Sequence, residues 1–390
     1  MKIAIRTEYP NWFDCALLIL ACMNFGAKGS VVLLAWALWN IIRIGKLRVN
    51  FDLYCCIAIS AVVILFSFTQ SSWEEAIKGA LYTTVYICGN TGYHHAKDKR
   101  KFIYLTILSV TLGFFAFLVL TYFYNLSYDI ISGQRILYSI WTQERMSVTL
   151  VGLIACVVIG FSCWAFLFSR QRFAKILSII GLFFILVLNL RSATRTPFVL
   201  AILVYGFVIS YILFSTGKVR KTVLWYVALA IALGTLLYIG NVGGIRDYIE
   251  GSPLFARFET ESLETGRVDI FFNFFKYWLD YPLGGSNIHA SMGIAPHFYW
   301  QQFYDLYGAP GGLPLLVLSI SVVKNIVSLL RAKRIESTNM LFVCMYSAML
   351  IQCCVEPVFT GYPILFWALV LIHGMANAYL RDTKRGVSYA

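Results

Sequence analysis

The stretch that decides the fold class is "SVTLVGLIACVVIGFSCWAFLF", Ser147 to Phe168, which contains no charged residue. As an α-helix it is long enough to cross the hydrocarbon core of a bilayer, which is ~30 Å thick. A helix also satisfies the backbone hydrogen bonds of the segment internally, as hydrocarbon requires. The sequence therefore predicts a transmembrane helix here, and the next question is how many more the chain contains.

The composition of the whole chain agrees with a membrane protein. Of its 390 residues, 59% are apolar, 16% are aromatic and only 13% are charged, which is far from the mixture of soluble domains. We interpret the net charge of +13 as a topology signal and expect no nucleic-acid partner. The ten cysteines all lie in apolar runs without metal-ligand spacing, so we interpret them as small buried residues.

Apolar segments long enough, or nearly long enough, to span the bilayer occur twelve times, and the sequence supports a range of eleven to thirteen. The N-terminal segment has no small-residue cleavage site after its apolar core, so we interpret it as a retained first span. The chain is thus predicted to be an all-α polytopic membrane protein. The predicted spans are residues 12–27, 30–44, 52–69, 77–92, 102–124, 147–168, 176–190, 198–215, 222–239, 312–330, 340–355 and 364–380.

The basic residues test this count. With a cytoplasmic N-terminus, 21 of the 32 Lys and Arg residues fall in seven short loops or ends on one side of the membrane, as the positive-inside rule requires. We therefore predict that both termini are cytoplasmic. The seven basic pieces are the N-terminal start and residues 43–48, 97–101, 170–175, 218–221, 331–334 and 381–385.

The longest segment on the predicted outer side is residues 240–311, which divides the chain into three parts. Residues 1–239 form a membrane domain of nine spans, 240–311 a helical extracytoplasmic loop domain, and 312–390 the last three spans. In the loop, "TGRVDIFFNFFKYWLDYP" has the apolar period of an amphipathic helix that lies along the interface. Pro296 at a first helical position and Gly308 as a stop predict a second helix.

Four residues on the predicted outer side, two paired arginines, a third arginine and a histidine, are candidates for chemistry. Arg191 and Arg195 lie between two spans, and their i, i+4 spacing would place them on one face if the turn were helical. Arg267 opens the amphipathic helix. His297 begins the second helix, and its neighbours on that helix are Gln301, Tyr304 and Asp305.

These residue types suit the transfer of a group away from a diphosphate. Arginine presents a permanent charge in a planar fork that matches phosphate oxygens and can stabilise a leaving diphosphate without a metal. A neutral histidine can take a proton from an attacking hydroxyl. The structural alternatives are a snorkelling Arg191, a helix-capping His297 and a solvated Glu74–Glu75 pair. His373, inside the last span, is expected to form an interhelical hydrogen bond.

At these residues the sequence resembles the bacterial O-antigen polymerase and O-antigen ligase family. The resemblance covers roughly Arg191 to Gly312 and follows the order of three pieces: "SATRTPF", then "GRVDIFFNFFKYWLDYPLGG", then "HFYWQQFYDLYGAPGG". Where ligases of the family often have Asn after the histidine, this chain has Phe298, which favours a polymerase and leaves Asp305 as an alternative base.

The resemblance implies a fold like the glycosyltransferase C superfamily and a metal-independent, inverting glycosyltransferase of the cell inner membrane, without a cofactor. Donor and acceptor would be glycans on undecaprenyl diphosphate, and partners would include membrane lipid, a chain-length regulator and a flippase. Carried over by position, Arg195 or Arg191 and Arg267 would hold the donor diphosphate, and His297 would activate the acceptor hydroxyl. Gln301 and Tyr304 would bind the substrate.

Two alternatives stay open beside the polymerase. The first is an O-antigen ligase that transfers the finished glycan to a lipid A-core acceptor. The second, of another class, is a flippase or transporter of the same lipid-linked sugars. Transporters often carry ionisable residues in broken spans near the midplane, whereas here the polar residues are expected to gather at one leaflet.

Overall fold

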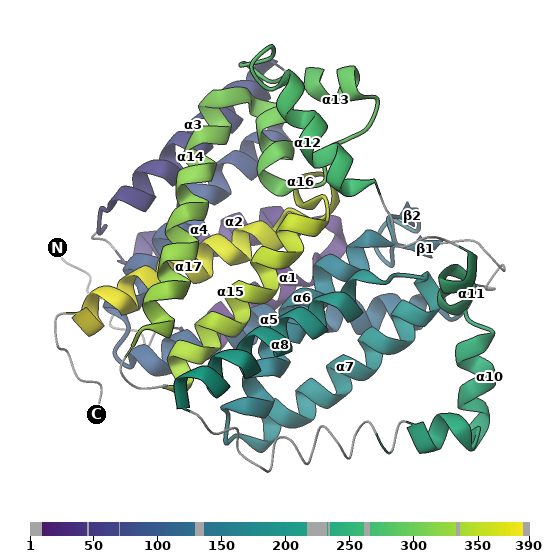
Figure 1. Cartoon of the computed structure of the whole chain (residues 1–390). Coiled ribbons are helices and arrows are strands. Elements are labelled where there is room, and N and C mark those ends of the chain that lie inside the picture. Colours follow the sequence, from purple (N-terminus) through teal and green to yellow (C-terminus); the bar gives the residue numbers. More distant parts are fainter. Residues whose placement is uncertain are drawn as a thin grey trace.

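The computed structural model describes residues 10–44, 47–69, 71–128, 136–216, 232, 235–260, 266–332 and 336–384, and these are helical almost throughout (Figure 1). The α-helices that carry the membrane domain are α1 (Trp12–Cys22), α2 (Gly29–Ile44), α3 (Phe51–Thr69), α4 (Trp73–His95), α5 (Lys99–Asn125), α6 (Thr149–Leu167), α7 (Arg172–Ser192), α8 (Thr196–Thr216), α14 (Tyr299–Leu330), α15 (Ser337–Val355) and α17 (Ile364–Lys384).

Shorter elements connect them. They are the 3₁₀ turns η1 (Phe25–Ala27) and η2 (Val242–Gly244), the helices α10 (Ile245–Glu250), α11 (Pro253–Thr260), α12 (Arg267–Tyr277), α13 (Asn287–Met292) and α16 (Val358–Gly361), and two strands. The strands β1 (Leu137–Tyr138) and β2 (Arg145–Met146) pair antiparallel, with Leu137 opposite Met146.

The prediction of an all-α polytopic membrane protein is confirmed, but the predicted count of twelve spans is not. Within the described ranges, eight helices are long and apolar enough to cross a membrane, namely α3, α5, α6, α7, α8, α14, α15 and α17. The helices α1 and α2 are apolar but shorter. Most of the predicted span at 222–239 lies outside the described residues.

Helix α4 is long enough to span but only weakly hydrophobic, and its position explains why. It packs against α2, α3 and α17, so polar residues of its second half such as Asn90 and Thr91 are buried in protein rather than exposed to lipid. Gly89 of α4 and Gly374 of α17 mark the crossing point, because a Cβ on Gly89 would lie 2.2 Å from the carbonyl oxygen of Leu371. Small residues that let two helix backbones approach are typical of packing in membranes.

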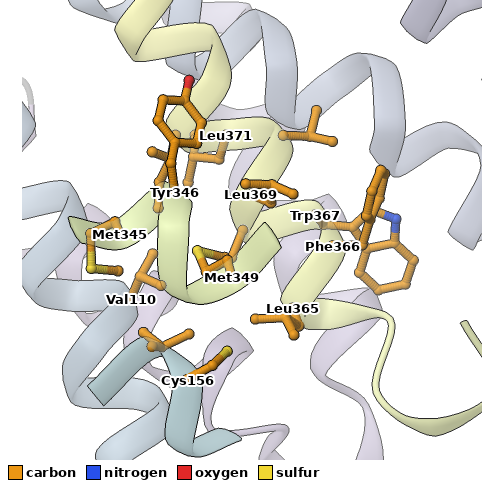
Figure 2. Packing of buried hydrophobic residues seen from close by; sticks show 14 of the residues in the cluster. Val110, Cys156, Met345, Tyr346, Met349, Leu365, Phe366, Trp367, Leu369 and Leu371 are labelled. Atoms are coloured by element: carbon orange, nitrogen blue, oxygen red, sulfur yellow. The ribbon is translucent and has the colours of Figure 1, made fainter. Parts of the chain in front are cut away.

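The core lies where α5, α6, α15 and α17 meet (Figure 2). The buried side chains of Val110, Cys156, Met345, Met349 and Leu365 interdigitate there. Among the eight candidate spans of the described residues, α6 and α17 have 89% of their most apolar stretch buried inside the protein, whereas α8 has 17% buried. Of these eight, α8 therefore exposes the most surface. All ten cysteines are free thiols. Eight are buried, which confirms their interpretation as small core residues, whereas Cys15 and Cys354 are partly exposed.

The described loops gather at two ends of the bundle. At one end, Arg48 contacts His94 at 3.4 Å and Lys99 pairs with Asp382, which brings together three of the predicted basic loops. We call this the basic end. At the opposite end, Lys28 pairs with Glu74 at 3.5 Å, and the loops around residues 125–148, 192–196 and 355–363 collect there. The segregation of loops therefore follows the predicted pattern, and the orientation in the membrane stays a prediction.

The loop segment is helical where the structure describes it. The predicted amphipathic helix is confirmed as α12, and Gly266, with φ 64°, precedes it. The predicted stop at Gly308 is a break rather than an end, because α14 continues to Leu330 beyond a non-helical Gly308 with φ 64° and ψ −163°. The N–H of Ala309 donates to the carbonyl of Pro282 at 2.8 Å, which holds the break against the loop.

Candidate functional site

Helix α12 is fixed against the first part of α14 by aromatic rings. Phe274 is fully buried, and its ring centroid lies 5.9 Å from that of Trp300 and 5.8 Å from that of Tyr304. Phe298, just before α14, packs on Phe271 with centroids 5.6 Å apart. Such edge contacts add to the large area that each ring buries. Helix α12 and the first part of α14 therefore form one unit, and α12 lies near the top of the bundle in Figure 1.

Gln301 and Tyr304, the predicted substrate-binding side chains of α14, are both buried and bonded to the backbone of this unit. The Nε2 of Gln301 donates to the carbonyl of Phe271 at 2.9 Å, and the Tyr304 hydroxyl donates to the carbonyl of Trp278 at 2.9 Å. The second bond satisfies a carbonyl at the end of α12 that has no partner within the helix. Both residues therefore position α12, and their contact with a substrate stays a prediction.

Asp305 is also buried and serves the neighbouring helix α13. Its carboxylate accepts a hydrogen bond from the backbone N–H of His289 at 3.0 Å, and its backbone carbonyl accepts one from Ser286 at 2.8 Å. A carboxylate at a helix N-terminus satisfies N–H groups that lack a partner in the helix. This contact gives Asp305 a structural role, and its role as an alternative base is untested.

His297 lies in an extended segment rather than in a helix. The prediction that Pro296 and His297 open the helix is wrong, because α14 begins at Tyr299, with Phe298 as its extended N-cap. The carbonyl of Pro296 accepts a hydrogen bond from Nε2 of Gln302 at 2.9 Å, which holds the segment in place. The sequence predicted that His297 and Gln301 share a helical face. Instead, His297 is half-buried in the segment before the helix and does not lie on that face.

The turn between α7 and α8 is not helical, although a helical turn was the condition for Arg191 and Arg195 to share one face. Ala193 adopts φ 53° and ends α7, so Arg191 and Arg195 are not on one helix face. The Arg191 guanidinium donates to the carbonyl of Tyr128, at the end of α5. Arg195 is half-buried directly before α8. The two arginines therefore face different surroundings, and Arg191 is tied to the backbone of a neighbouring loop.

A buried polar group beside this turn was missed at the sequence level. Thr196 donates from Oγ1 to Oε1 of Glu356 at 2.8 Å, and Glu356 is only 1% exposed. Gln352 is fully buried one turn earlier in α15, against Gly152 of α6. The signal was a carboxylate that directly ends a predicted span on the outer side, a position where ionisable residues are costly and usually have a partner.

The same group connects the arginine turn to the histidine segment. Phe359, three residues after Glu356, packs on Phe303 of α14 with ring centroids 4.9 Å apart. The chain from Thr196 through Glu356 and Phe359 to Phe303 therefore places Arg195 and the start of α14 at the same end of the bundle. Arg267 is the first residue of α12, and its side chain lies outside the described residues.

A cavity of about 260 Å³ opens at this end, between the starts of α2 and α4 and the α16–α17 segment. Its lining combines aromatic faces with charged groups, including Trp73, Tyr362, Lys28, Glu74 and Lys78. Lys78 pairs with Glu75, which also accepts from the Tyr307 hydroxyl of α14 at 3.4 Å. Aromatic faces beside hydrogen-bonding groups suit a sugar ring. Glu75 therefore links α4 to α14, and its part in a site stays a prediction.

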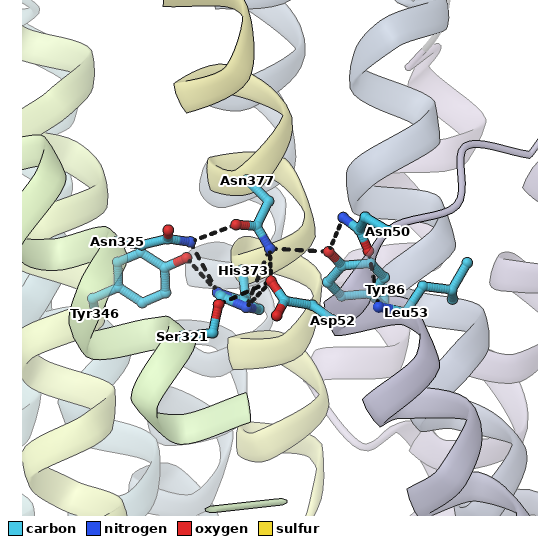
Figure 3. Close-up of polar contacts among 9 residues, drawn as sticks. All are labelled: Asn50, Asp52, Leu53, Tyr86, Ser321, Asn325, Tyr346, His373 and Asn377. Atoms are coloured by element: carbon cyan, nitrogen blue, oxygen red, sulfur yellow. Dashed lines mark hydrogen bonds and ion pairs between the residues drawn. The ribbon is translucent and has the colours of Figure 1, made fainter. Parts of the chain in front are cut away.

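A second polar group lies inside the membrane domain (Figure 3). It is nearer the basic end, because Asp52 lies in the first turn of α3 and Asn377 one turn before Arg381 in α17. Asp52 of α3 contacts Nε2 of His373 at 3.2 Å, and Asn377, Asn325, Ser321, Tyr86 and Tyr346 complete the network. The prediction that His373 forms interhelical hydrogen bonds is confirmed. The expectation that polar residues gather at one leaflet is wrong, since these side chains come from five helices at the other end of the bundle.

The chain matches no protein-family model, and no curated protein matches it significantly. Within the described ranges, no group of three or more His, Cys, Asp and Glu side chains is placed to hold a metal ion. The candidate site is therefore defined by its own geometry: the arginine turn, the Glu356 group, the His297 segment and the cavity beside α4.

Proposed function

We propose that the chain is a polymerase that joins undecaprenyl-diphosphate-linked oligosaccharide repeat units of an O-antigen or a similar polysaccharide. The observation that carries this proposal is the convergence of Arg195 and the His297 segment at the end opposite the basic loops, through Glu356 and Phe359. An enzyme acting on lipid-linked diphosphates needs cationic and proton-accepting groups together at one membrane surface.

In this proposal the growing chain is the donor and a single lipid-linked repeat is the acceptor. Arg195 and Arg267 hold the donor diphosphate, and Arg191, which already bonds the Tyr128 carbonyl, contributes charge from further away. The acceptor hydroxyl attacks the anomeric carbon, the bond from that carbon to the diphosphate oxygen breaks, and His297 takes the hydroxyl proton. The products are a chain longer by one repeat and undecaprenyl diphosphate.

The proposed setting is the bacterial inner membrane, with the basic end in the cytoplasm and the candidate site at the periplasmic face. The positive-inside rule supports this orientation, because Arg48, Lys99 and Arg381 all lie at one end. A flippase would deliver the lipid-linked repeats to that face, and a chain-length regulator would act on the product.

A transporter of lipid-linked sugars is the second candidate, and one observation favours it. Asp52 and His373 are a buried ionisable pair within the membrane domain, and such pairs mark proton relays and substrate paths in transporters. A carrier would not need the arginine turn and the His297 segment that converge at the opposite end. This difference makes the polymerase the preferred proposal.

One reconstitution separates the candidates. The purified full-length protein in proteoliposomes receives a defined undecaprenyl-diphosphate-linked repeat unit with no second acceptor. A ladder of product lengths is the expected result. A reaction that starts only when lipid A-core is added identifies a ligase instead. Movement of the lipid across the bilayer without new glycosidic bonds contradicts the proposal and supports the transporter.

A further inference from the structure

The network around Asp52 surrounds one carboxylate oxygen with hydrogen-bond donors. Oδ2 of Asp52 accepts from Ser321 Oγ at 2.9 Å, from His373 Nε2 at 3.2 Å and from Asn377 Nδ2. Asp52 also lies in the first turn of α3, where the helix dipole favours an anion. Among the described residues, His373 is the only cationic candidate that pairs with it.

The hydrogen bonds around His373 fix which ring nitrogen carries its proton. Asn377 uses Nδ2 as a donor to Asp52 and Tyr86, so its Oδ1 accepts from Asn325 Nδ2 at 2.8 Å. Asn325 Nδ2 therefore also points its donor at Nδ1 of His373, 3.3 Å away. Nδ1 is then an acceptor, and the single ring proton sits on Nε2 and faces Asp52.

With that tautomer and an ionised Asp52, the pair has a net negative charge inside the membrane domain. His373 is fully buried and Asp52 is 7% exposed. An unneutralised charge in such a place is costly, and binding one proton removes it. Nδ1 is the atom free to take that proton, because the Tyr346 hydroxyl lies 3.1 Å from it and can reverse from donor to acceptor.

Asp52 is slightly exposed and lies two residues after Asn50, which is half-buried. Asn50 Nδ2 donates to the Tyr86 hydroxyl at 2.6 Å, and that hydroxyl accepts from Asn377 at 2.9 Å. On the other side, His373 lines a narrow cavity between α14 and α17 that also reaches Ser319 and Tyr299.

We propose that the Asp52–His373 pair is a proton-binding site of the membrane domain, which goes beyond the proposed polymerase activity. The proton leaves hydronium and bonds to the Nδ1 lone pair of His373, and no electron is transferred. The new N–H donates to Tyr346 of α15, and Asn325 of α14 must turn its amide. The titratable groups that face the ring are Asp52 from α3, Tyr86 from α4 and Tyr346 from α15, with Tyr299 of α14 across the cavity.

The test observes the ring directly. The full-length protein, labelled with ¹⁵N-histidine in nanodiscs and without any sugar substrate, is titrated from about pH 8 to about pH 5, the range in which histidines change charge. We expect a signal that is absent from His373→Gln to change from the neutral Nε2–H form to the doubly protonated form. A His373 signal that stays neutral throughout overturns the proposal.

Two variants keep the test decisive. Asp52→Asn removes the charge that holds the proton, so the doubly protonated His373 signal should weaken or disappear. Tyr346→Phe keeps the ring in place and removes the acceptor for Nδ1–H, so this signal should also weaken. A doubly protonated signal of wild-type intensity in both variants contradicts the site. His94→Gln, at the basic end, is the matched control and should leave the His373 signal unaltered. Because no sugar is present, this outcome is independent of the polymerase assay.

Discussion

Tyr304 and Gln301 show how a residue type that suits a substrate can instead serve the fold. Both are polar residues on an aromatic helix beside a histidine, which is the pattern that predicted a sugar platform. In the structure each bonds a backbone carbonyl of α12, at Phe271 and Trp278. A sequence does not reveal such contacts, because they depend on how a segment thirty residues away folds back.

Tyr304→Phe tests this structural role. The substitution leaves the buried Trp278 carbonyl without its donor, so we expect a loss of stability of about 1 kcal/mol, seen as a lower midpoint of thermal unfolding in detergent. Tyr54→Phe, whose side chain is exposed on α3, is the control and should not change the midpoint. Lost glycan transfer with unchanged unfolding would instead show that the Tyr304 hydroxyl acts on the substrate.

His94, at the basic end, predicts a pH effect. Burial and the neighbouring Arg48 charge lower the pKa of His94 to about 4. Because this pKa lies below its unfolded value of about 6.5, the unfolded chain binds the proton more readily. Stability should therefore be full above about pH 6.5 and decline as pH falls toward 4.

The measurement compares unfolding midpoints across this pH range. The unfolding midpoint of His94→Gln should decline less than that of wild type as pH falls. His95→Gln, at an exposed position of the same helix, should keep the wild-type pH profile. Equal profiles for all three proteins would show that His94 is not the group responsible.

At the scale of elements, the helices follow the apolar runs closely. The predicted span 52–69 became α3 at 51–69, and 102–124 became α5 at 99–125, because the length of an apolar run and its basic flank define both ends. The loop before α14 was less predictable. Gly308 has the left-handed φ that signals a helix stop, yet the chain resumes helix immediately and continues into the membrane.

The break at Gly308 gives an element-scale prediction. At φ 64° and ψ −163° a side chain is strained, and a Cβ would lie 2.3 Å from the Pro282 carbonyl oxygen. Gly308→Ala should therefore cost about 1–3 kcal/mol and detach the loop from α14. Gly206→Ala in α8, where a Cβ meets nothing within 4 Å, should be neutral or slightly stabilising. Limited proteolysis of the loop measures the difference, and equal cleavage of both variants would contradict the role of Gly308.

At the scale of the whole molecule, the sequence predicted the two-sided arrangement of loops but, apart from His373, not the polar interior. Charge counting separates the ends because lysine and arginine are excluded from the hydrocarbon. Asp52 and Asn377, by contrast, lie in different spans that are more than three hundred residues apart, and nothing in either span indicates that they meet. Glu356 was missed for the same reason, since its partner Thr196 lies in another helix.

The proposed orientation can be tested with epitope tags at exposed loop positions. A tag inserted after Gln143 should bind antibody in intact spheroplasts, because this loop lies opposite the basic end. A tag after Lys97 should bind only after the membrane is permeabilised. The reverse pattern would place the candidate site in the cytoplasm and remove the basis for a periplasmic polymerase.

The central claim is that the arginine turn and the His297 segment act together on a lipid-linked diphosphate. The most direct measurement is the rate of ladder formation from an undecaprenyl-diphosphate-linked repeat by purified His297→Ala, Arg195→Ala and Arg267→Ala proteins, with Arg246→Ala, an exposed arginine of α10, as the control. We expect each of the three to lose about 100-fold or more in rate at near-normal expression, and the control to match wild type. Normal ladders from all three variants would contradict the account.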